Sequence, residues 1–125
     1  MNEYKPKVLI IEDNEDLNEM FKTAFEEKGY NVEVSLNGMD GITKAVEFDP
    51  DVILLDIMMP QMDGYEVLQA LKNNSSLKAK VVINSNLEQD KDADKALKMG
   101  ADLYLKKSEY TPFEAVEKVE ELLGR

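Results

Sequence analysis

Short aliphatic runs alternate with longer amphipathic segments along the whole of this 125-residue chain. The runs at 8–11, 52–55 and 81–83 are continuously aliphatic, which is typical of strands covered on both faces of a parallel sheet. A further short run, at 103–105, follows a Gly-Ala turn and is also predicted to be a strand.

The predicted strand at 32–36, which is the second in chain order, has a different pattern. Its apolar residues Val32, Val34 and Leu36 alternate with Glu33 and Ser35. Such alternation favours a strand that is buried on one side and lies nearer the edge of a sheet. The valines and Leu36 are therefore expected to point toward the core.

The segments between the runs carry apolar residues at the spacing of amphipathic helices. The first helix is predicted to begin at Asn14 and to end at Gly29, and the last to have Thr111 as N-cap and Pro112 as its first residue. The predicted apolar faces are Leu17, Met20, Phe21, Ala24 and Phe25; Ile42, Ala45 and Val46; Tyr65, Leu68 and Leu71; and Phe113, Val116, Val119 and Leu123.

The segment 89–99 has the thinnest apolar stripe of the predicted helices. Only Ala93, Ala96 and Leu97 form it, among charged neighbours. We therefore expect a shallowly packed helix and treat its outer face as a candidate moving or partner-binding surface. Charge reversal at Lys91 and Lys95 that left target binding unchanged would contradict this hypothesis.

The strand and helix order predicts an α/β fold. Strands that alternate with helices form a parallel sheet with helices on both faces and right-handed crossovers. Five strands are too few for a closed eight-stranded barrel, so we expect one open, doubly wound sheet. The length suits a single domain over residues 1–125. In such sheets the functional site lies beyond the carboxyl ends of the strands.

Composition excludes several kinds of chemistry. The chain has no histidine and no cysteine, which removes Ser-His-Asp and Cys-His catalysis, thiolate or imidazole zinc sites, and disulfides. Its net charge of −11 opposes direct binding to nucleic acid or to anionic lipid.

The longest aliphatic runs are too short to span a membrane, and the N-terminus does not resemble a signal peptide. We therefore expect a cytoplasmic location.

Polar residues follow the predicted strands at their carboxyl ends. Glu12 and Asp13 follow the first strand, Asp56 the third, Ser85 the fourth and Lys107 the fifth. Taken singly, each has an ordinary explanation as a first-turn acid of a helix, a cap or a loop residue. Together they place three carboxylates, a hydroxyl and a lysine at one edge. Close carboxylates repel one another, and an oxygen-only ligand set favours Mg²⁺ beside an anion such as phosphate.

The stretch 52–64, VILLDIMMPQMDG, resembles the signature of response-regulator receiver domains of two-component signalling. The resemblance extends from about Val8 to Leu123, and its other landmarks are Glu12-Asp13, Ser85, Gly100-Ala101-Asp102, Tyr104 and Lys107. The chain is similar in extent to the single-domain receivers of chemotaxis. The resemblance implies a flavodoxin-like five-stranded sheet with strand order 2-1-3-4-5.

The resemblance also implies a phosphoacceptor function. Asp56 would take a phosphoryl group from a phosphohistidine on a histidine kinase or a histidine phosphotransfer protein. Asp13, Asp56 and the backbone carbonyl of Met58 would hold Mg²⁺, which Glu12 would reach through water. Lys107 would pair with the phosphoryl oxygens. The chain would catalyse only this transfer to itself and slow autodephosphorylation, and would not be an enzyme acting on other substrates.

Two further residues have implied roles in switching. Ser85 would turn toward the phosphoryl group and Tyr104 would follow inward, altering the face built from the fourth helix, fifth strand and fifth helix. Tyr104 could instead be only a packing residue of the last strand. The downstream protein target is unknown, and both a monomer and a phosphorylation-dependent dimer are open.

Three residues depart from the pattern of the family. Ser108 stands where proline usually follows the lysine in a cis bond, and because a cis bond without proline costs roughly 3–4 kcal/mol, we predict a trans 107–108 peptide. Asn86 replaces a small apolar residue, which leaves the lifetime of the phosphoryl group open. Lys106 replaces an apolar residue; strand alternation assigns Lys107 to the site, but register alone leaves Lys106 possible.

Other functional classes are also open. A phosphatase or phosphotransferase of the haloacid-dehalogenase type needs a second acid two residues after the nucleophile, where this chain has Met58. A phosphorylation-independent interaction module on the same fold would account for the changes at Asn86 and Ser108. A nucleotide-binding function lacks any G-x-G-x-x-G or P-loop pattern. The chain is either a stand-alone receiver or part of a longer one; its last residues read as a natural helix end.

Overall fold

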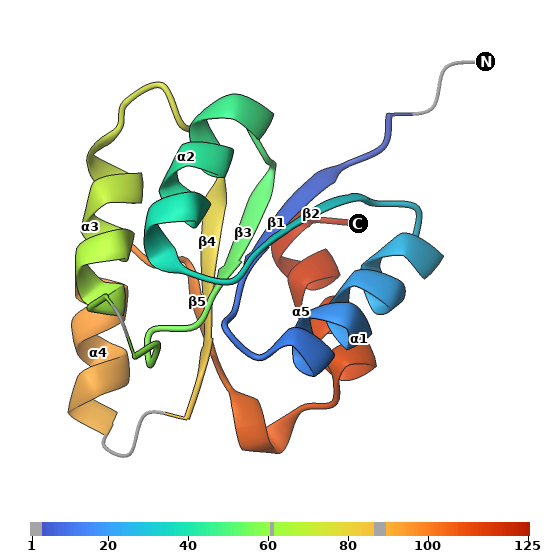
Figure 1. Cartoon of the computed structure of the whole chain (residues 1–125). Coiled ribbons are helices and arrows are strands. Elements are labelled where there is room, and N and C mark those ends of the chain that lie inside the picture. Colours follow the sequence, from blue (N-terminus) through green and yellow to red (C-terminus); the bar gives the residue numbers. More distant parts are fainter. Residues whose placement is uncertain (1–3, 61, 87–89) are drawn as a thin grey trace.

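The computed structural model describes residues 4–60, 62–86 and 90–125, and within these it contains one parallel five-stranded sheet (Figure 1). The strand order is β2-β1-β3-β4-β5, which confirms the predicted α/β class and the order 2-1-3-4-5. The strands are β1 (Lys7–Ile11), β2 (Asn31–Ser35), β3 (Val52–Leu55), β4 (Lys80–Ser85) and β5 (Leu103–Lys106). The helices are α1 (Glu15–Glu27), α2 (Gly38–Phe48), α3 (Gly64–Asn73), α4 (Asp90–Lys98) and α5 (Pro112–Leu123), with a 3₁₀ turn η1 (Lys107–Glu109) after β5.

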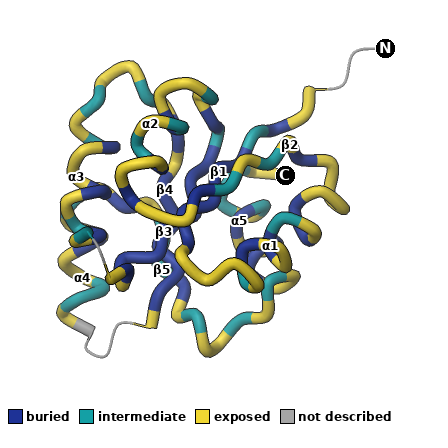
Figure 2. The backbone as a smooth tube through the Cα atoms, viewed as in Figure 1, coloured by how far each residue is buried: buried dark blue, intermediate teal, exposed yellow. Residues whose placement is uncertain are grey.

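Helices cover both faces of the sheet and form two separate hydrophobic layers. Leu9, Ile11 and Ile53 point from the strands toward the layer formed with α2, α3 and α4. Val8 and Ile10 point the other way, toward α1 and α5. Figure 1 shows these two groups of helices on opposite sides of the sheet, and Figure 2 shows the buried strands between them. The continuously aliphatic strands are therefore buried on both faces, as their sequences predict.

The strand order reverses between β1 and β3, and this position aligns the ends of the two central strands. The pairing of Ile11 with Leu55 closes their ladder, so that Glu12 and Asp56 leave the sheet side by side. The Asp56 N–H donates to the Ile11 carbonyl at 3.0 Å, which extends the ladder by one bond. Topology thus places two carboxylates at the point where ligands bind in open α/β sheets.

The helix starts follow the predicted caps. The Asn14 side chain accepts from the Leu17 N–H at 3.0 Å at the start of α1. At the start of α5, Thr111 accepts from the Glu114 N–H at 3.2 Å, and the Glu114 carboxylate accepts from the Thr111 N–H at 2.9 Å. Gly29, with a φ of +90°, follows the end of α1 in the left-handed region that glycine tolerates best.

Some predicted core residues are in fact exposed. Met20, Val46 and Phe113 are each more than half exposed, because the buried stripes of their helices are narrower than the apolar sequence pattern. Met20 and Phe113 line one shallow hollow between α1 and α5 instead of entering the core. In β2 the prediction of an inward Leu36 was wrong. The strand ends at Ser35, which is buried with its hydroxyl 2.9 Å from the Asp40 carboxylate, and Leu36 is exposed.

The fourth helix has the shallow packing that its sequence predicts. Its described part begins at Asp90, so the predicted start at residue 89 lies outside the described residues. Ala96 is fully buried, whereas Leu97 is 42% exposed. A hydrogen bond also links this helix to α3, because the Tyr65 hydroxyl donates to the Asp92 carbonyl at 3.1 Å. None of the helices in the described part of the chain is both long and apolar enough to cross a membrane.

Candidate functional site

Three carboxylates meet at the carboxyl edge of the sheet. Glu12 and Asp13 follow β1 and Asp56 follows β3, and one oxygen of each lies within 4.8 Å of the other two. Glu12 and Asp56 are 3% and 5% exposed, whereas Asp13 is open to solvent. The structure therefore brings together the three acids that the strand-end rule predicts. Oxygen ligands with one exposed member suit a hydrated Mg²⁺, which keeps several of its waters.

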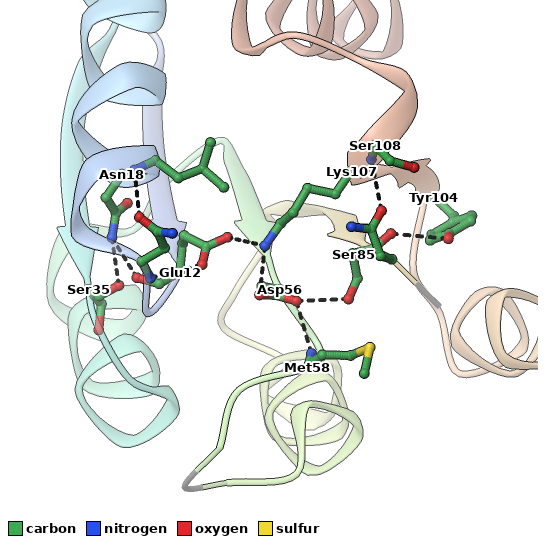
Figure 3. Close-up of polar contacts among 12 residues, drawn as sticks. Glu12, Asn18, Ser35, Asp56, Met58, Ser85, Tyr104, Lys107 and Ser108 are labelled. Atoms are coloured by element: carbon green, nitrogen blue, oxygen red, sulfur yellow. Dashed lines mark hydrogen bonds and ion pairs between the residues drawn. The ribbon is translucent and has the colours of Figure 1, made fainter. Parts of the chain in front are cut away.

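The Lys107 ammonium lies between two of these acids (Figure 3). Its Nζ is 2.6 Å from Glu12 Oε1 and 2.9 Å from Asp56 Oδ2. Lys107 opens the η1 turn directly after β5, so the end of the strand brings its backbone to the carboxyl edge of the sheet. Lys106, the alternative, is the exposed last residue of β5. Of the two lysines, the structure places Lys107 at the acidic cluster.

Burial and ion pairing act in opposite directions on the two charged partners. Burial raises the pKa of Glu12, and the Asp56 carboxylate adds to the effect, although Lys107 and the Asn14 N–H oppose it. For Lys107, burial by itself lowers the pKa, but the hydrogen bonds to Glu12 and Asp56 outweigh it and the pKa is raised. The lysine therefore stays charged, whereas the charged form of Glu12 is the one that this environment disfavours.

The two oxygens of Asp56 have different partners. Oδ1 accepts from the Ser85 hydroxyl at 2.8 Å and from the Met58 N–H at 2.9 Å, whereas Oδ2 faces Lys107. Figure 3 shows these groups converging on the carboxylate from three segments of the chain. Two hydrogen-bond donors and one cation therefore surround the Asp56 carboxylate, and charge-assisted contacts of this kind orient a nucleophile or a metal ligand.

Tyr104 is connected to the site through Ser85. Its hydroxyl donates to the Ser85 backbone carbonyl at 3.1 Å, from β5 to the end of β4. The residue is half-buried and faces the layer that contains α4. Tyr104 thus has a polar contact next to the site in addition to its packing contacts.

Asn86 and Ser108, two of the residues that depart from the family pattern, are joined by a hydrogen bond. The Ser108 N–H donates to the Asn86 side-chain carbonyl at 2.8 Å. A proline at 108 has no N–H and could not make this bond. No cis peptide occurs in the described residues, so the 107–108 peptide is trans, as predicted.

Asn18 holds the backbone of the site by hydrogen bonds, and the sequence analysis did not predict this role. This residue of α1 is 3% exposed, and its Nδ2 donates to the Glu12 carbonyl at 2.6 Å and to the Ser35 carbonyl at 3.3 Å. It therefore fixes the backbone from which Glu12 projects. Its spacing could have indicated its burial, because Asn18 lies three residues before Phe21 and seven before Phe25, on the apolar stripe of the helix.

The fold and the edge site together define a doubly wound α/β protein with an acidic, lysine-bearing centre at its strand ends. The family model of the response regulator receiver domain matches residues 8–120. The chain belongs to this family.

Relatives and solved structures agree with this assignment. The chain is 34% identical over 119 residues to protein PilG of Pseudomonas aeruginosa, covering 94% of this chain and 82% of PilG. It is 35% identical over 121 residues to the DNA-binding dual master transcriptional regulator RpaA of Synechocystis, covering 96% of this chain and 47% of RpaA. The chain thus spans about half the length of some curated relatives and most of others.

Similar folds are found among solved receiver domains. The receiver domain of the Francisella response regulator 1452 has a TM-score of 0.85 and 32% identity, with 97% of this chain and 98% of that one covered. The signal receiver domain of a LuxO-type repressor protein from Vibrio parahaemolyticus has a TM-score of 0.88 and 25% identity, with 98% and 92% covered.

Proposed function

We propose that this chain is the phosphoacceptor of a two-component phosphorelay and that Asp56 is the acceptor. The donor would be a phosphohistidine on a histidine kinase or a histidine phosphotransfer protein. An Asp56 oxygen attacks phosphorus, the phosphorus–nitrogen bond to the imidazole breaks, and the electron pair stays with the histidine. The observation that carries this proposal is the buried Asp56 carboxylate with Ser85 and Lys107 on its two oxygens.

The surrounding residues supply charge neutralisation and positioning, which are the main requirements of phosphoryl transfer. Asp13 and Asp56, with the Met58 carbonyl, would hold Mg²⁺, and Glu12 would reach it through water. The cation when bound neutralises the phosphoryl oxygens and the crowded acids. Lys107 already lies 2.9 Å from Asp56, so its ammonium can pass to an incoming phosphoryl oxygen with a small movement.

A route for switching leads from the site to an adjacent surface. Movement of the Ser85 hydroxyl toward a phosphoryl group would disturb the backbone carbonyl that Tyr104 binds. Tyr104 and Leu97 line a hollow between α4 and β5, and this face of α4, β5 and α5 is the proposed output surface. Binding experiments with the phosphorylated chain would identify the downstream protein and show whether the active form is a monomer or a dimer. We place the reaction in the cytoplasm, where the phosphodonor proteins act.

The rival proposal is an interaction module that does not need phosphorylation. It takes its support from the Asn86–Ser108 contact, which differs from the expected family pattern beside the acceptor. Under this proposal the acidic cluster would still bind Mg²⁺ but Asp56 would take up no phosphoryl group.

Intact-mass measurement after incubation with Mg²⁺ and acetyl phosphate tests the proposal. We expect a gain of one phosphoryl group that chelator abolishes and that Asp56→Asn prevents. Asp94→Asn, which neutralises an exposed acid of α4, is the matched control and should be phosphorylated normally. Unchanged mass in a protein that still binds Mg²⁺ would refute the phosphoacceptor proposal and favour the interaction module.

A further inference from the structure

A hydrogen bond joins the chain neighbours of Ser85 and Lys107, the two residues whose side chains contact Asp56. Asn86 directly follows Ser85, and Ser108 directly follows Lys107. The Ser108 N–H donates to Asn86 Oδ1 at 2.8 Å, and Figure 3 marks this bond at Ser108. Because Ser85 and Lys107 contact opposite oxygens of Asp56, the bond closes a ring that runs through the acceptor carboxylate.

The bond lies where the sheet no longer holds the two segments together. The ladder between β4 and β5 ends with the pairing of Ser85 and Lys106. Beyond it, the Asn86 side-chain carbonyl takes the place of a backbone carbonyl and adds one more cross-strand bond. We call this bond the 86–108 clasp.

The backbone at Lys107 has few other constraints. It begins the three-residue η1 turn, and that turn has no side-chain hydrogen bond at its N-cap. The Lys107 side chain must nevertheless hold its ammonium 2.9 Å from Asp56 across a long flexible stem. A fixed backbone at 107–108 reduces the number of positions that the ammonium samples.

We propose that Asn86 is a positioning residue for phosphoryl transfer and that the 86–108 clasp holds Lys107 in place against Asp56. This inference rests on the proposed acceptor function of Asp56. Asn86 does not contact the reacting atoms; it acts through the backbone of Ser108 on Lys107. The identity of residue 108 matters only through its N–H.

The first measurement concerns the clasp itself and uses the unphosphorylated full chain. Amide hydrogen exchange of the Ser108 N–H, followed by NMR, should be roughly three- to tenfold faster in Asn86→Ala, as expected for the loss of one exposed hydrogen bond. Asn86→Asp keeps an acceptor oxygen and Ser108→Ala keeps the N–H, so both should retain the protection. Asn74→Ala is the matched control, because it removes a half-buried asparagine whose Oδ1 accepts from the Ser76 N–H at 3.0 Å.

The second measurement is the rate of phosphoryl uptake from acetyl phosphate at saturating Mg²⁺. Asn86→Ala should slow uptake by roughly three- to tenfold, and Asn74→Ala should not change it. In a Lys107→Ala background the Asn86→Ala change should have little further effect, because the group that it positions is gone. A purely structural role would slow uptake by the same factor in both backgrounds.

Each outcome is decisive. Unchanged Ser108 exchange in Asn86→Ala would overturn the clasp, and equal slowing with and without Lys107 would overturn the positioning role. If the wild-type chain takes up no phosphoryl group, the proposed function fails and the positioning role fails with it, while the exchange result still decides whether the clasp exists. Should Asn86→Ala unfold, Asn86→Leu keeps the side-chain bulk without an acceptor and is measured in its place.

Discussion

Asp56 and Lys107 are 51 positions apart in the chain, yet the lysine ammonium lies 2.9 Å from the aspartate carboxylate. The contact spans the ends of β3 and β5, which are separated in the sheet by β4. Glu12 lies on the other side of the same ammonium at 2.6 Å. One cation therefore balances two buried carboxylates, and this balance determines how the site responds to mutation, metal and pH.

Lys107→Ala should destabilise the metal-free protein. The change leaves Glu12 and Asp56 close together without a counter-charge, and because the lysine is partly exposed we expect a loss of about 1–3 kcal/mol in the free energy of unfolding. Mg²⁺ should restore more stability to this variant than to the wild type, since the cation takes over the neutralising role. Urea unfolding with and without Mg²⁺ measures both effects. Lys106→Ala is the control, and an equal loss there would contradict the assignment of Lys107.

Glu12→Gln should change the pH dependence of stability. Burial raises the pKa of Glu12, so the folded state holds this proton more tightly than the unfolded state does. The associated stability is complete below the ordinary glutamate pKa and is lost as the pH rises through the raised folded value. Without Mg²⁺, the variant should therefore gain stability relative to the wild type as the pH rises above the ordinary glutamate pKa of about 4.5. Denaturant unfolding at several pH values tests this; a constant difference between the two proteins would count against it.

Tyr30→Phe should remove a component of alkaline unfolding. Burial, with a contribution from Glu120, raises the pKa of Tyr30 to about 12. Stability from this group is complete below the ordinary tyrosine pKa and is lost as the pH rises toward the folded value, by about 2 kcal/mol. The buried hydroxyl has no hydrogen-bond partner among the described residues, so at neutral pH the variant should be as stable as the wild type or up to about 1 kcal/mol more stable. Equal alkaline losses in unfolding curves of the two proteins would disprove this role of Tyr30.

Gly64→Ala should weaken both the fold and the site. A Cβ at this position would collide with the backbone of Ile57, the residue after Asp56. Because backbone must shift to relieve the collision, we expect a loss of about 1–3 kcal/mol and a smaller thermal shift on adding Mg²⁺. Gly29→Ala is a useful comparison, since its cost comes only from a φ of +90° with nothing within 4 Å. That variant should lose stability but keep the full Mg²⁺ shift in thermal unfolding.

Much of the fold follows from local sequence patterns. Continuous aliphatic runs at β1, β3 and β4 predict buried parallel strands because the burial of both strand faces leaves no polar position. The Thr111-Pro112 start of α5 is correct for a similar reason, since a cap depends on only a few adjacent residues. The rule that sites lie at the carboxyl ends of strands then brings Glu12, Asp13 and Asp56 together without any knowledge of distances.

The predictions that were wrong concern residues whose burial depends on packing between elements. Met20 and Phe113 fit the apolar pattern of their helices but lie outside the buried stripe where α1 and α5 meet the sheet. Asn18 is the opposite case, a polar residue that is buried because two backbone carbonyls from other segments accept its hydrogen bonds. Neither outcome can be read from a single helix.

The alternation of strands and helices, the helix caps and the residues at the carboxyl edge could all be predicted from the sequence, because each depends on periodicity or on a few neighbouring positions. The strand order was predicted from the resemblance to receiver domains. The packed structure was needed to establish that Lys107 rather than Lys106 reaches Asp56, and that Asn86 and Ser108 are hydrogen-bonded. These contacts depend on the register of β4 and β5 and on the path of the chain after the ladder ends. Contact between residues that are distant in sequence is fixed by packing of the whole sheet, which no local pattern contains.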